Sequence, residues 1–427
     1  MFLVDTNDIF EFLGSFGKSG KPVRDLSRIR TLLYELSDPQ NGLRFIHVAG
    51  TNGKGSVCEM LTECLTAEGY RVGTFTSPYI IEYCDRIRIN GKNIPLHYLR
   101  RYAGIVKTAA ERTSFGFEYS QFEITMCIAL LYFKERGCDV VVWETGVGGL
   151  LDSTNVIENP LVSVICSVSY DHTAILGGTI EEITRQKCGI IKEGSPCVLS
   201  FGNRNITEDI FLRTAICNHS KAVIPNIKEL ETISDTLYGC EFIYKGNRYK
   251  TAMCGIHQVS NAVTVIEALG AIKYALPVSE SAIKNGIWNA KIPARTQVVS
   301  QNPLIILDGS HNPDGFSALS HFLETKTDAP RYILVGMLEE KDSAESVKQL
   351  CPLADKIITV DTFHPKALSS VKLAEITSAE GVETTAVSDV AKGVKTLKGL
   401  LQNGGTGIIC GSLYLASEIL TKHLTEL

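Results

Sequence analysis

A glycine-rich segment supplies the clearest chemistry in the chain. Gly50-Thr51-Asn52-Gly53-Lys54-Gly55-Ser56 follows a predicted strand over residues 45–48 and opens a predicted helix. Glycines let the backbone approach a phosphate, successive N–H groups bind an anion, and a helix N-terminus adds partial positive charge. Lys54 supplies a cation for terminal phosphates, and Ser56 can cap the helix or meet a metal. The spacing departs from the strict P-loop, because Val48 stands six residues before Lys54. The alternative is a tight turn with an exposed lysine.

Two further groups follow apolar runs at the same predicted sheet edge. Glu144 comes directly after the run 139–143 and just before Gly146. Carboxyl ends of parallel strands are where α/β sheets bind ligands, so Glu144 could hold Mg²⁺ beside a nucleotide. Its alternative role is to cap the next turn. His172 follows the predicted strand 162–168, which favours a functional histidine over a structural one.

Lys187 lies on the apolar face of a predicted helix. Thr179 and Glu182 form a capping box that starts this helix. Its inward face carries Ile180 and Ile183, and Lys187 falls seven residues after Ile180. A lysine on such a face costs free energy unless it is paired or chemically altered. The alternative is a packed stem whose amine reaches solvent.

A second strand–loop–helix unit lies near the C-terminal third. The run 304–307 ends in Asp308-Gly309-Ser310-His311-Asn312-Pro313, where Asn312 suits a helix N-cap and Pro313 the first helical position. Asp308 could bond a ribose hydroxyl, and His311 could touch a phosphate. Upstream, His257–Asn261 and Arg295 flank the expected domain boundary. An arginine at a hinge can reach a nucleotide phosphate.

The elements that position these residues alternate between strand and helix. Val57, Met60, Leu61, Cys64 and Leu65 define one face of a helix that Gly69 ends. Such alternation predicts an α/β fold with parallel sheets. Strands are predicted at residues 43–48, 71–76, 140–143, 162–168, 197–200, 304–307, 332–335, 356–360 and 407–410.

Residues 203–261 have a different pattern. Residues 241–244, a turn at 245–247 and residues 248–250 predict a hairpin, interpreted as a small antiparallel elaboration of a P-loop parallel-sheet N-terminal domain. A helix is predicted at about 260–275. A smaller Rossmann-like α/β domain follows, which gives domains of residues 1–295 and 296–427.

Composition excludes several classes of protein. The chain has 427 residues, 44% apolar and 21% charged, which is typical of a soluble globular protein. Its net charge is 42 − 47 = −5, so we expect no general attraction to nucleic acid or anionic membranes. The 13 cysteines form no CxxC pair, which favours buried thiols in a reducing cytoplasm. The N-terminus lacks signal-peptide features, and no apolar run approaches the ~20 residues of a membrane span.

Taken in order, these motifs closely resemble the folylpolyglutamate synthase/dihydrofolate synthase family of the Mur-ligase superfamily. The resemblance covers nearly the whole chain. Its matching stretches are His47–Ser56, Thr76–Pro78, Asp85–Gly91, Phe122–Thr125, Glu144–Asn155, Asp171–Thr173, Lys187–Ile191, Asp308–Pro313 and Cys410–Tyr414.

The resemblance implies ATP-dependent amide ligation. ATP would phosphorylate a carboxylate of a pteroate or folate, and the α-amine of L-glutamate would attack the acyl phosphate. The products would be ADP, phosphate and a new amide, through chemistry that depends on positioning and charge neutralisation. The implied partners are these small molecules, with no nucleic acid or membrane, and the expected state is a cytoplasmic monomer.

The resemblance also assigns roles to residues. The loop 51–54 would hold ATP phosphates, and Ser77, Glu144 and His172 match Mg²⁺ ligands. Lys187 matches a lysine that carries a carbamate and binds a second Mg²⁺; K⁺ is a further candidate cation. ATP contacts match Asn261, Arg295 and Asp308. Pterin-facing segments correspond to Ser120, Gln121, Phe122, Glu123, Leu151, Asp152 and Ser153.

Two positions depart from the family pattern. Tyr79 stands where many bacterial members have histidine, and Leu150 stands where many have arginine. Both lie near the folate-facing segments, whereas the phosphate and metal positions keep the pattern. The alternatives are a ligase for another acid, such as a cell-wall precursor, and a nucleotide-switched binding protein without ligase chemistry.

Overall fold

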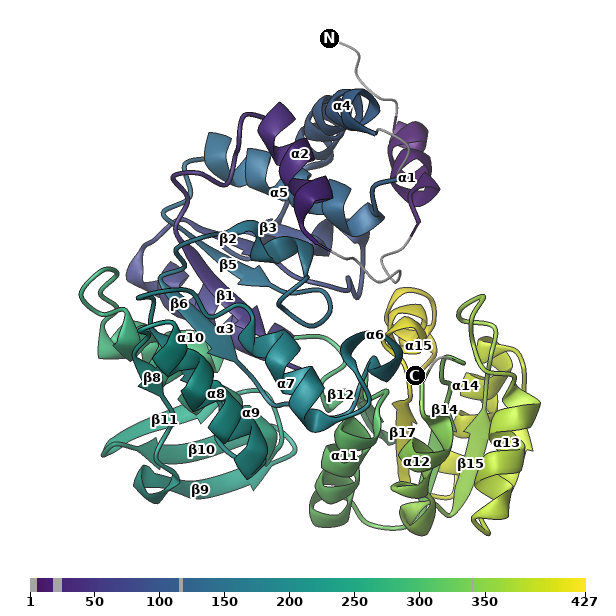
Figure 1. Cartoon of the computed structure of the whole chain (residues 1–427). Helices are drawn as coiled ribbons and strands as arrows, with labels where there is room; N and C mark the ends of the chain where they lie inside the picture. The colour runs from purple at the N-terminus through teal and green to yellow at the C-terminus, as the bar shows by residue number, and fades with distance from the viewer. Residues whose placement is uncertain (1–5, 18–24, 115–117, 340) are drawn as a thin grey trace. The chain divides into compact units, whose positions relative to one another are not determined.

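The computed structural model describes residues 6–17, 25–114, 118–339 and 341–427 (Figure 1). The chain forms two compact units, each with its own parallel sheet. The first comprises the chain up to Leu230 together with Ser260–Ala290, and the second comprises Glu231–Val259 and Lys291–Leu427. Residues 1–5, the start of the N-terminus for which the sequence analysis expected no signal peptide, lie outside the described residues.

The first unit is built on an eight-stranded sheet of order β4-β3-β2-β5-β1-β6-β7-β8. Strands β2, β5, β1, β6, β7 and β8 run parallel, whereas β3 and β4 form an antiparallel edge. All five strands predicted for this part exist, with ends that differ by a few residues. The bounds are β1 Phe45–Ala49, β2 Val72–Phe75, β3 Ile87–Ile89, β4 Lys92–Asn93, β5 Val140–Glu144, β6 Val162–Ile165, β7 Cys197–Leu199 and β8 Ala222–Val223.

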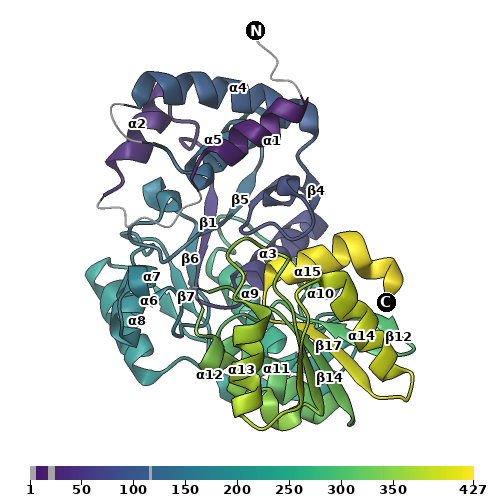
Figure 2. The same cartoon turned by 90° about the vertical axis from the view of Figure 1, so that its right-hand side faces the viewer.

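Helices cover this sheet because β1, β2, β5, β6 and β7 are buried along their whole length. Helices α1 (Thr6–Ser15), α2 (Ser27–Glu35), α4 (Leu96–Thr113) and α5 (Gln121–Glu135) lie together in Figures 1 and 2 and share a core with strand residues such as Phe75 and Trp143. Helix α3 (Lys54–Glu68) packs on the sheet and against α10 (Glu280–Asn289). The remaining helices are α6 (Thr173–Leu176), α7 (Ile180–Cys188) and α8 (Asn205–Cys217).

The second unit holds a six-stranded sheet of order β12-β13-β17-β14-β15-β16. Only β12 runs antiparallel to its neighbour. The strands are β12 Gln297–Gln301, β13 Leu304–Leu307, β14 Arg331–Val335, β15 Lys356–Thr359, β16 Thr384–Ala386 and β17 Thr406–Cys410. The helices are α11 Pro313–Lys326, α12 Ser343–Lys348, α13 Ser370–Ala379, α14 Val390–Leu401 and α15 Leu413–Glu418. The four strands predicted here are confirmed, but the sequence analysis missed β12 and β16.

The predicted hairpin is part of a three-stranded antiparallel sheet, β9 (Leu230–Thr236), β10 (Gly239–Tyr244) and β11 (Asn247–Thr251). Its tight turn is Lys245-Gly246, with φ of +48° and +76°, as a two-residue hairpin loop requires. Cys254 belongs to the core of the second unit, and Lys326 on α11 pairs with Asp235 at 3.1 Å. This sheet therefore groups with the second unit, although the sequence analysis read it as an elaboration of the first domain. Helix α9 (Ile256–Ala271) follows it.

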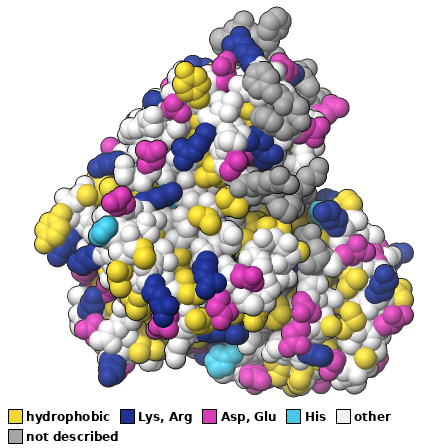
Figure 3. All heavy atoms as spheres, in the orientation of Figure 1, with side chains coloured by type: hydrophobic (Ala, Val, Ile, Leu, Met, Phe, Trp, Pro, Cys, Tyr) yellow, Lys and Arg dark blue, Asp and Glu magenta, His cyan; other side chains and the backbone are white. Residues whose placement is uncertain are grey.

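The cysteines are free thiols, and all except Cys138 and Cys217 are buried. This confirms that they act as small core residues. Two of them, Cys58 on α3 and Cys166 after β6, come close to the glycine-rich loop. On the face shown in Figure 3, positive and negative side chains are interspersed. Within the described part of the chain, no helix has the length and apolar character to span a bilayer.

Candidate active site

The glycine-rich loop is fixed to the end of β6. The Thr51 N–H donates to the Ser167 carbonyl at 2.7 Å, and the Thr51 hydroxyl donates to the Ser169 carbonyl at 3.0 Å. Gly50 has no room for a side chain, because a Cβ would lie 2.6 Å from the Cys166 Cβ. The loop therefore keeps one conformation through contacts with a strand more than a hundred residues away.

Helix α3 begins at Lys54 without a side-chain cap. Its N-cap is Gly53, with φ of +86°, and the first turn carries no acidic residue. The free N–H groups and the helix dipole therefore add to the charge of Lys54. The Lys54 amine folds back and donates to the carbonyls of Gly50 at 3.1 Å and Thr51 at 3.2 Å. This concentration of positive charge at a helix start would favour an anion.

Asn261 on α9 contacts the same loop. A Cβ on Gly53 would lie 2.6 Å from the Asn261 Oδ1, so only glycine fits between them. Asn261 itself is buried. The structure thus brings Asn261, which the resemblance matches to an ATP contact, to the turn that precedes Lys54.

Glu144 and Ser77 meet at the carboxyl ends of β5 and β2. Glu144 is 3% exposed, and its Oε2 accepts a hydrogen bond from the Ser77 N–H at 2.9 Å. A buried carboxylate needs compensating donors or cations, and this backbone N–H supplies part of that compensation. Two of the three predicted Mg²⁺ ligands therefore lie side by side.

Lys187 is buried on the apolar face of α7, which favours the first of the two alternatives that the sequence left open. It is 3% exposed. The pKa of Lys187 is lowered to about 7, mainly by burial and also by the nearby charge of Lys54, while Asp171 partly opposes this shift. A substantial fraction of an amine with such a pKa is neutral near pH 7, and the neutral form is nucleophilic. The capping box of Thr179 and Glu182 that starts α7 is also confirmed.

The electrostatics around Cys166 show that three predicted residues converge. Burial raises the pKa of the Cys166 thiol to about 12; Lys54 and Lys187 act to lower it, and Glu144 acts to raise it. One thiol therefore lies within electrostatic range of all three charged side chains. The sequence places them more than 40 residues apart in each case, and the parallel sheet brings them to one edge.

His172 lies at the start of α6, next to Asp171. It has a left-handed backbone with φ of +50°, and its side chain is 38% exposed. The Asp171 Oδ1 accepts from the His172 N–H at 2.8 Å, and the Nε2 lies 4.0 Å from Asp171 Oδ2. The described residues hold no group of three or more His, Cys, Asp or Glu side chains placed for a metal. A Mg²⁺ site here would therefore need serine and phosphate oxygens as well.

In the second unit, the Asp308 carboxylate accepts hydrogen bonds from neighbouring backbone N–H groups. Its Oδ2 accepts from the Thr296 N–H at 2.7 Å, and its Oδ1 accepts from the Ser310 N–H at 2.8 Å. His311 Nδ1 lies 2.9 Å from the Gly309 carbonyl. Burial lowers the pKa of His257, Asp308 opposes this shift, and Arg295 adds to it. Arg295, Asp308 and His257 therefore lie within electrostatic range of one another.

Residues 120–123 begin helix α5. Ser120 is its N-cap and forms a capping box with Glu123. Glu123 is 1% exposed and is paired through both oxygens with Arg28, at 3.0 and 2.8 Å. Gln121 donates to the Leu13 carbonyl, and Phe122 packs against Phe75. These contacts give each side chain a structural role at the helix start.

Residues 151–153 lead into a short 3-10 helix, Ser153–Val156, which Asp152 caps. Asp152 accepts from the Val147 N–H at 2.9 Å and the Thr154 N–H at 3.0 Å. Burial raises its pKa, and these hydrogen bonds oppose the shift. Asp152 thus holds the glycine-rich turn that follows Glu144, whereas the neighbouring Leu150 is 46% exposed.

Tyr79, the first departure from the family pattern, contacts a cation. The Arg86 guanidinium lies 5.2 Å from the Tyr79 ring centroid and 5.3 Å from that of Tyr83. Such a stack is favourable and orders all three side chains. A tyrosine at this position therefore has a partner that a histidine would engage differently.

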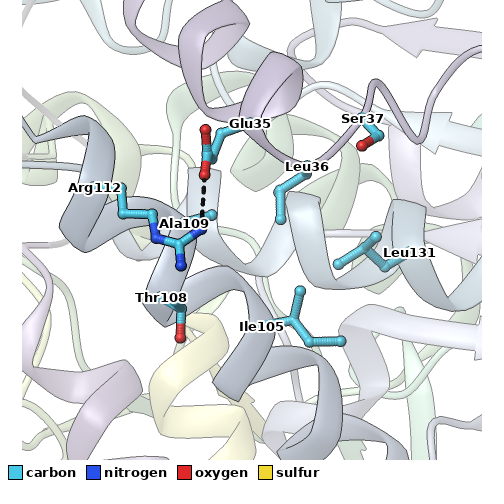
Figure 4. A pocket seen from close by; sticks show the side chains of 8 residues that line it. All are labelled: Glu35, Leu36, Ser37, Ile105, Thr108, Ala109, Arg112 and Leu131. Carbon is cyan, nitrogen blue, oxygen red and sulfur yellow. Dashed lines mark hydrogen bonds and ion pairs between the residues drawn. The ribbon is translucent and has the colours of Figure 1, made fainter.

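A pocket of about 390 Å³ lies elsewhere on the first unit, between α2, α4 and α5 (Figure 4). An Arg112–Glu35 pair at 3.2 Å crosses its rim. The pocket contains none of the predicted site residues. Its lining is Glu35, Leu36, Ser37, Ile105, Thr108, Ala109, Arg112 and Leu131.

Comparison with known proteins identifies the family. The Mur ligase middle domain matches residues 48–269, and the Mur ligase glutamate ligase domain matches residues 294–413. A dihydrofolate synthase/folylpolyglutamate synthase of Bacillus subtilis is 34% identical over 92% of this chain and 94% of its own length. The chain belongs to the folylpolyglutamate synthase/dihydrofolate synthase family.

Solved structures of this family have the same fold. A Mycobacterium tuberculosis folylpolyglutamate synthase, complexed with ADP and AMPPCP, superposes with a TM-score of 0.85 at 26% identity, covering 93% of this chain and 95% of that one. E. coli FolC in complex with DHPP and ADP gives a TM-score of 0.83 at 26% identity, covering 97% and 96%.

Several residues that hold the site of this family member were absent from the sequence analysis. Ser167 and Ser169 fix the glycine-rich loop, and Arg28 neutralises Glu123. Thr296 binds Asp308. Serine and threonine pair through single hydrogen bonds that leave no periodic pattern, and Arg28 lies 95 residues from its partner. For Thr296, its place directly after Arg295 was the one available signal.

Proposed function

We propose that this chain is an ATP-dependent ligase that joins L-glutamate to dihydropteroate, to folates, or to both. The observation that carries the proposal is the uncapped start of α3 with Lys54, beside the buried Glu144 and Lys187. Membership of the folylpolyglutamate synthase/dihydrofolate synthase family supports the same reaction.

The reaction would proceed in two steps. A carboxylate oxygen of the pteroate or folate attacks the γ-phosphorus of ATP, ADP leaves, and an acyl phosphate forms. The neutral α-amine of glutamate then attacks the acyl carbon, phosphate leaves, and the amine loses a proton as the amide forms. Lys54 and the N–H groups of residues 51–56 would neutralise the phosphate charge, as phosphoryl transfer requires.

The oxygen groups of this site fit Mg²⁺. Mg²⁺ prefers oxygen ligands and usually completes its shell with water and substrate phosphates, so Ser77 and Glu144 would hold it together with ATP, with His172 as the third ligand. Bound there, the ion would neutralise phosphate charge. A carbamate on Lys187 would turn a buried amine into an anion for a second Mg²⁺. The lowered pKa of the Lys187 amine favours its reaction with CO₂, because the neutral amine is the form that reacts. K⁺ is a further candidate.

The remaining assignments complete the proposal. Asn261, Arg295, Asp308 and His311 would contact ATP, and residues 120–123 and 151–153 would face the pterin. We assign ATP binding to residues 1–295 and the smaller domain to residues 296–427. The expected state is a cytoplasmic monomer without nucleic-acid or membrane partners.

One assay tests the proposal. Purified chain is mixed with ATP, Mg²⁺ and L-glutamate, with dihydropteroate and tetrahydrofolate as parallel acceptors. Phosphate release is measured, and mass spectrometry identifies the product. We expect phosphate release that depends on the acceptor, and a product heavier than the acceptor by one glutamyl residue. Release only with a non-pterin acid would contradict the folate assignment, and ATP binding without acceptor-dependent turnover would favour a nucleotide-switched protein.

A further inference from the structure

The turn that carries Arg295 has an unusual backbone. The residues on both sides of Arg295 have positive φ, +57° at Ala294 and +41° at Thr296. Side chains with a Cβ disfavour this region, and a β-branched threonine disfavours it most. Such conformations persist where the surroundings determine them, and they are concentrated at functional sites.

Four hydrogen bonds hold this turn within the second unit. The Ala294 N–H donates to the Gln297 Oε1 at 2.9 Å, and the Ala294 carbonyl accepts from the Gly309 N–H at 2.8 Å. The Thr296 N–H donates to Asp308 at 2.7 Å, and its hydroxyl donates to the Cys254 carbonyl at 3.0 Å. Ala294 and Thr296 are both buried. Both neighbours of Arg295 are therefore fixed by Gln297 in the same turn and by two other segments of the chain, at Cys254 and at residues 308–309.

Arg295 itself is held differently. Its side chain is half-buried, and among the described residues no hydrogen bond or ion pair engages its guanidinium. Its charge nevertheless acts on His257, whose pKa it lowers. The turn thus presents a cation without an anionic partner, at the end of a backbone that cannot rotate freely.

We propose that Thr296 and Gln297 are positioning residues that aim the Arg295 guanidinium at a phosphate of the bound nucleotide. This rests on the proposed function, because it takes ATP as the ligand. The Thr296 hydroxyl holds the turn to Cys254, and the Gln297 amide closes it from the other side. Neither touches the reacting atoms; each acts through the direction in which Arg295 leaves the backbone. A displacement of this guanidinium by about 1 Å is enough to weaken a phosphate contact.

The test combines conservative variants with two measurements. Thr296→Val removes the hydroxyl and keeps the side-chain shape, and Gln297→Ala removes the Oε1 acceptor. We expect each to raise KM for ATP and the Kd for ADP roughly tenfold. The KM values for the pterin acceptor and glutamate stay at wild-type level. Thr296→Ser retains the hydroxyl and restores wild-type values. Gln301→Ala, at the exposed far end of β12, is the matched control for Gln297→Ala.

A double-mutant cycle decides whether the effect passes through Arg295. In an Arg295→Ala background, Thr296→Val should add no further change in the Kd for ADP, because the group that it positions is gone. Effects that multiply would overturn the proposal, as would wild-type ADP affinity in both single variants. Thermal melting shows that each variant is folded, and Gln297→Ala carries the test if Thr296→Val does not fold.

The ADP measurement separates this inference from the proposed function. Titration calorimetry with ADP and Mg²⁺ needs no acceptor. If the wild-type chain binds ADP but never turns over with pterins, the ligase assignment fails and the positioning role is still measured. If turnover is normal and both variants bind ADP as wild type, the positioning role alone fails.

Discussion

Helices α3 and α11, one in each unit, both begin after a strand of a parallel sheet, but their N-termini are capped differently. Helix α3 follows β1 with Gly53 as N-cap, no capping side chain and no acid in its first turn. Helix α11 follows β13 with Asn312 as N-cap, whose Oδ1 accepts from the Gly315 N–H at 2.8 Å, and with Asp314 in its first turn. The first helix starts with a cation and the second with an anion.

This difference separates the helix start proposed to bind phosphate from a capped helix start. The N–H groups at the start of α11 are partly satisfied by Asn312, and Pro313 has no N–H to offer. At α3 the N–H groups lack such a cap, and Lys54 adds to the helix dipole. The sequence analysis found both strand–loop–helix units; the structure indicates that the first provides the open helix terminus. In the second unit, the residues proposed to contact ATP are Arg295, Asp308 and His311 instead.

The largest effect should come from the buried lysine of the first unit. Lys187→Ala removes the amine proposed to carry a carbamate, and we expect kcat to fall by about 10³-fold. Formate or acetate should restore part of the activity by replacing the lost carboxylate. Lys192→Ala is the matched control, because Lys192 is a half-buried lysine that donates to the Asn155 carbonyl. Wild-type turnover in Lys187→Ala would refute the role.

Lys54→Ala tests the open terminus directly. Removing the cation at the start of α3 should lower kcat by about 10²-fold, because phosphate charge is neutralised less well in the transition state. Lys134→Ala, an exposed lysine near the end of α5, should leave kcat unchanged. Equal effects of the two substitutions would mean that the loop does not bind the reacting phosphates.

Low pH should destabilise the folded chain through His47 on β1, the strand that precedes the glycine-rich loop. His47 on β1 is fully buried, and burial lowers its pKa to about 3, with a smaller contribution from Lys192. Between pH 6.5 and 3 the unfolded chain binds a proton here that the folded chain does not, so stability falls as pH falls. The loss is about 1.4 kcal/mol per pH unit.

Urea unfolding at several pH values measures this loss. His47→Gln should reduce the pH dependence of the free energy of unfolding in that window by about one proton, while leaving it unchanged above pH 7. Strand β13 in the second unit is Leu304–Leu307 and has no titratable group. An unchanged slope in the variant would show that other groups determine the acid response.

The smallest effect should come from the capped helix. Asn312→Ala removes the cap of α11 and should lower the free energy of unfolding by about 1 kcal/mol, which denaturant unfolding measures. The Kd for ADP should change far less than in Lys54→Ala. A loss of ADP affinity as large as that of Lys54→Ala would show that both helix termini bind phosphate. The difference proposed between the starts of α3 and α11 would then be wrong.

Local patterns predicted the elements of this fold. The apolar runs gave the strands, and the capping box of Thr179 and Glu182, the cap at Asn312 and the stop at Gly69 were all read from single residues. Helical periodicity predicted that Lys187 lies on an apolar helix face, and the structure shows that it is buried there. These features depend on neighbours within a few residues, so the sequence contains them directly.

Long-range pairing was not predictable in this way. Asn261 meets Gly53, and Arg28 meets Glu123, across distances in sequence at which many partners are equally plausible. The left-handed backbone at Ala294 and Thr296 has no signal, because neither residue is glycine. The grouping of the antiparallel sheet with the second unit depends on contacts such as Lys326 with Asp235, which no local pattern announces.

The buried thiols of Cys58 and Cys166 can be used to measure how often the structure around the glycine-rich loop opens. Burial raises the pKa of both Cys58 and Cys166, so an alkylating reagent reaches their thiolates only when the surrounding structure opens. Cys217 is exposed and records the reagent's intrinsic speed. Mass spectrometry of the alkylated peptides would thus follow opening around the loop, residue by residue, in the unmodified native sequence. A nucleotide that stabilises the loop would lower the alkylation rates of Cys58 and Cys166, whereas the alkylation rate of Cys217 would stay the same.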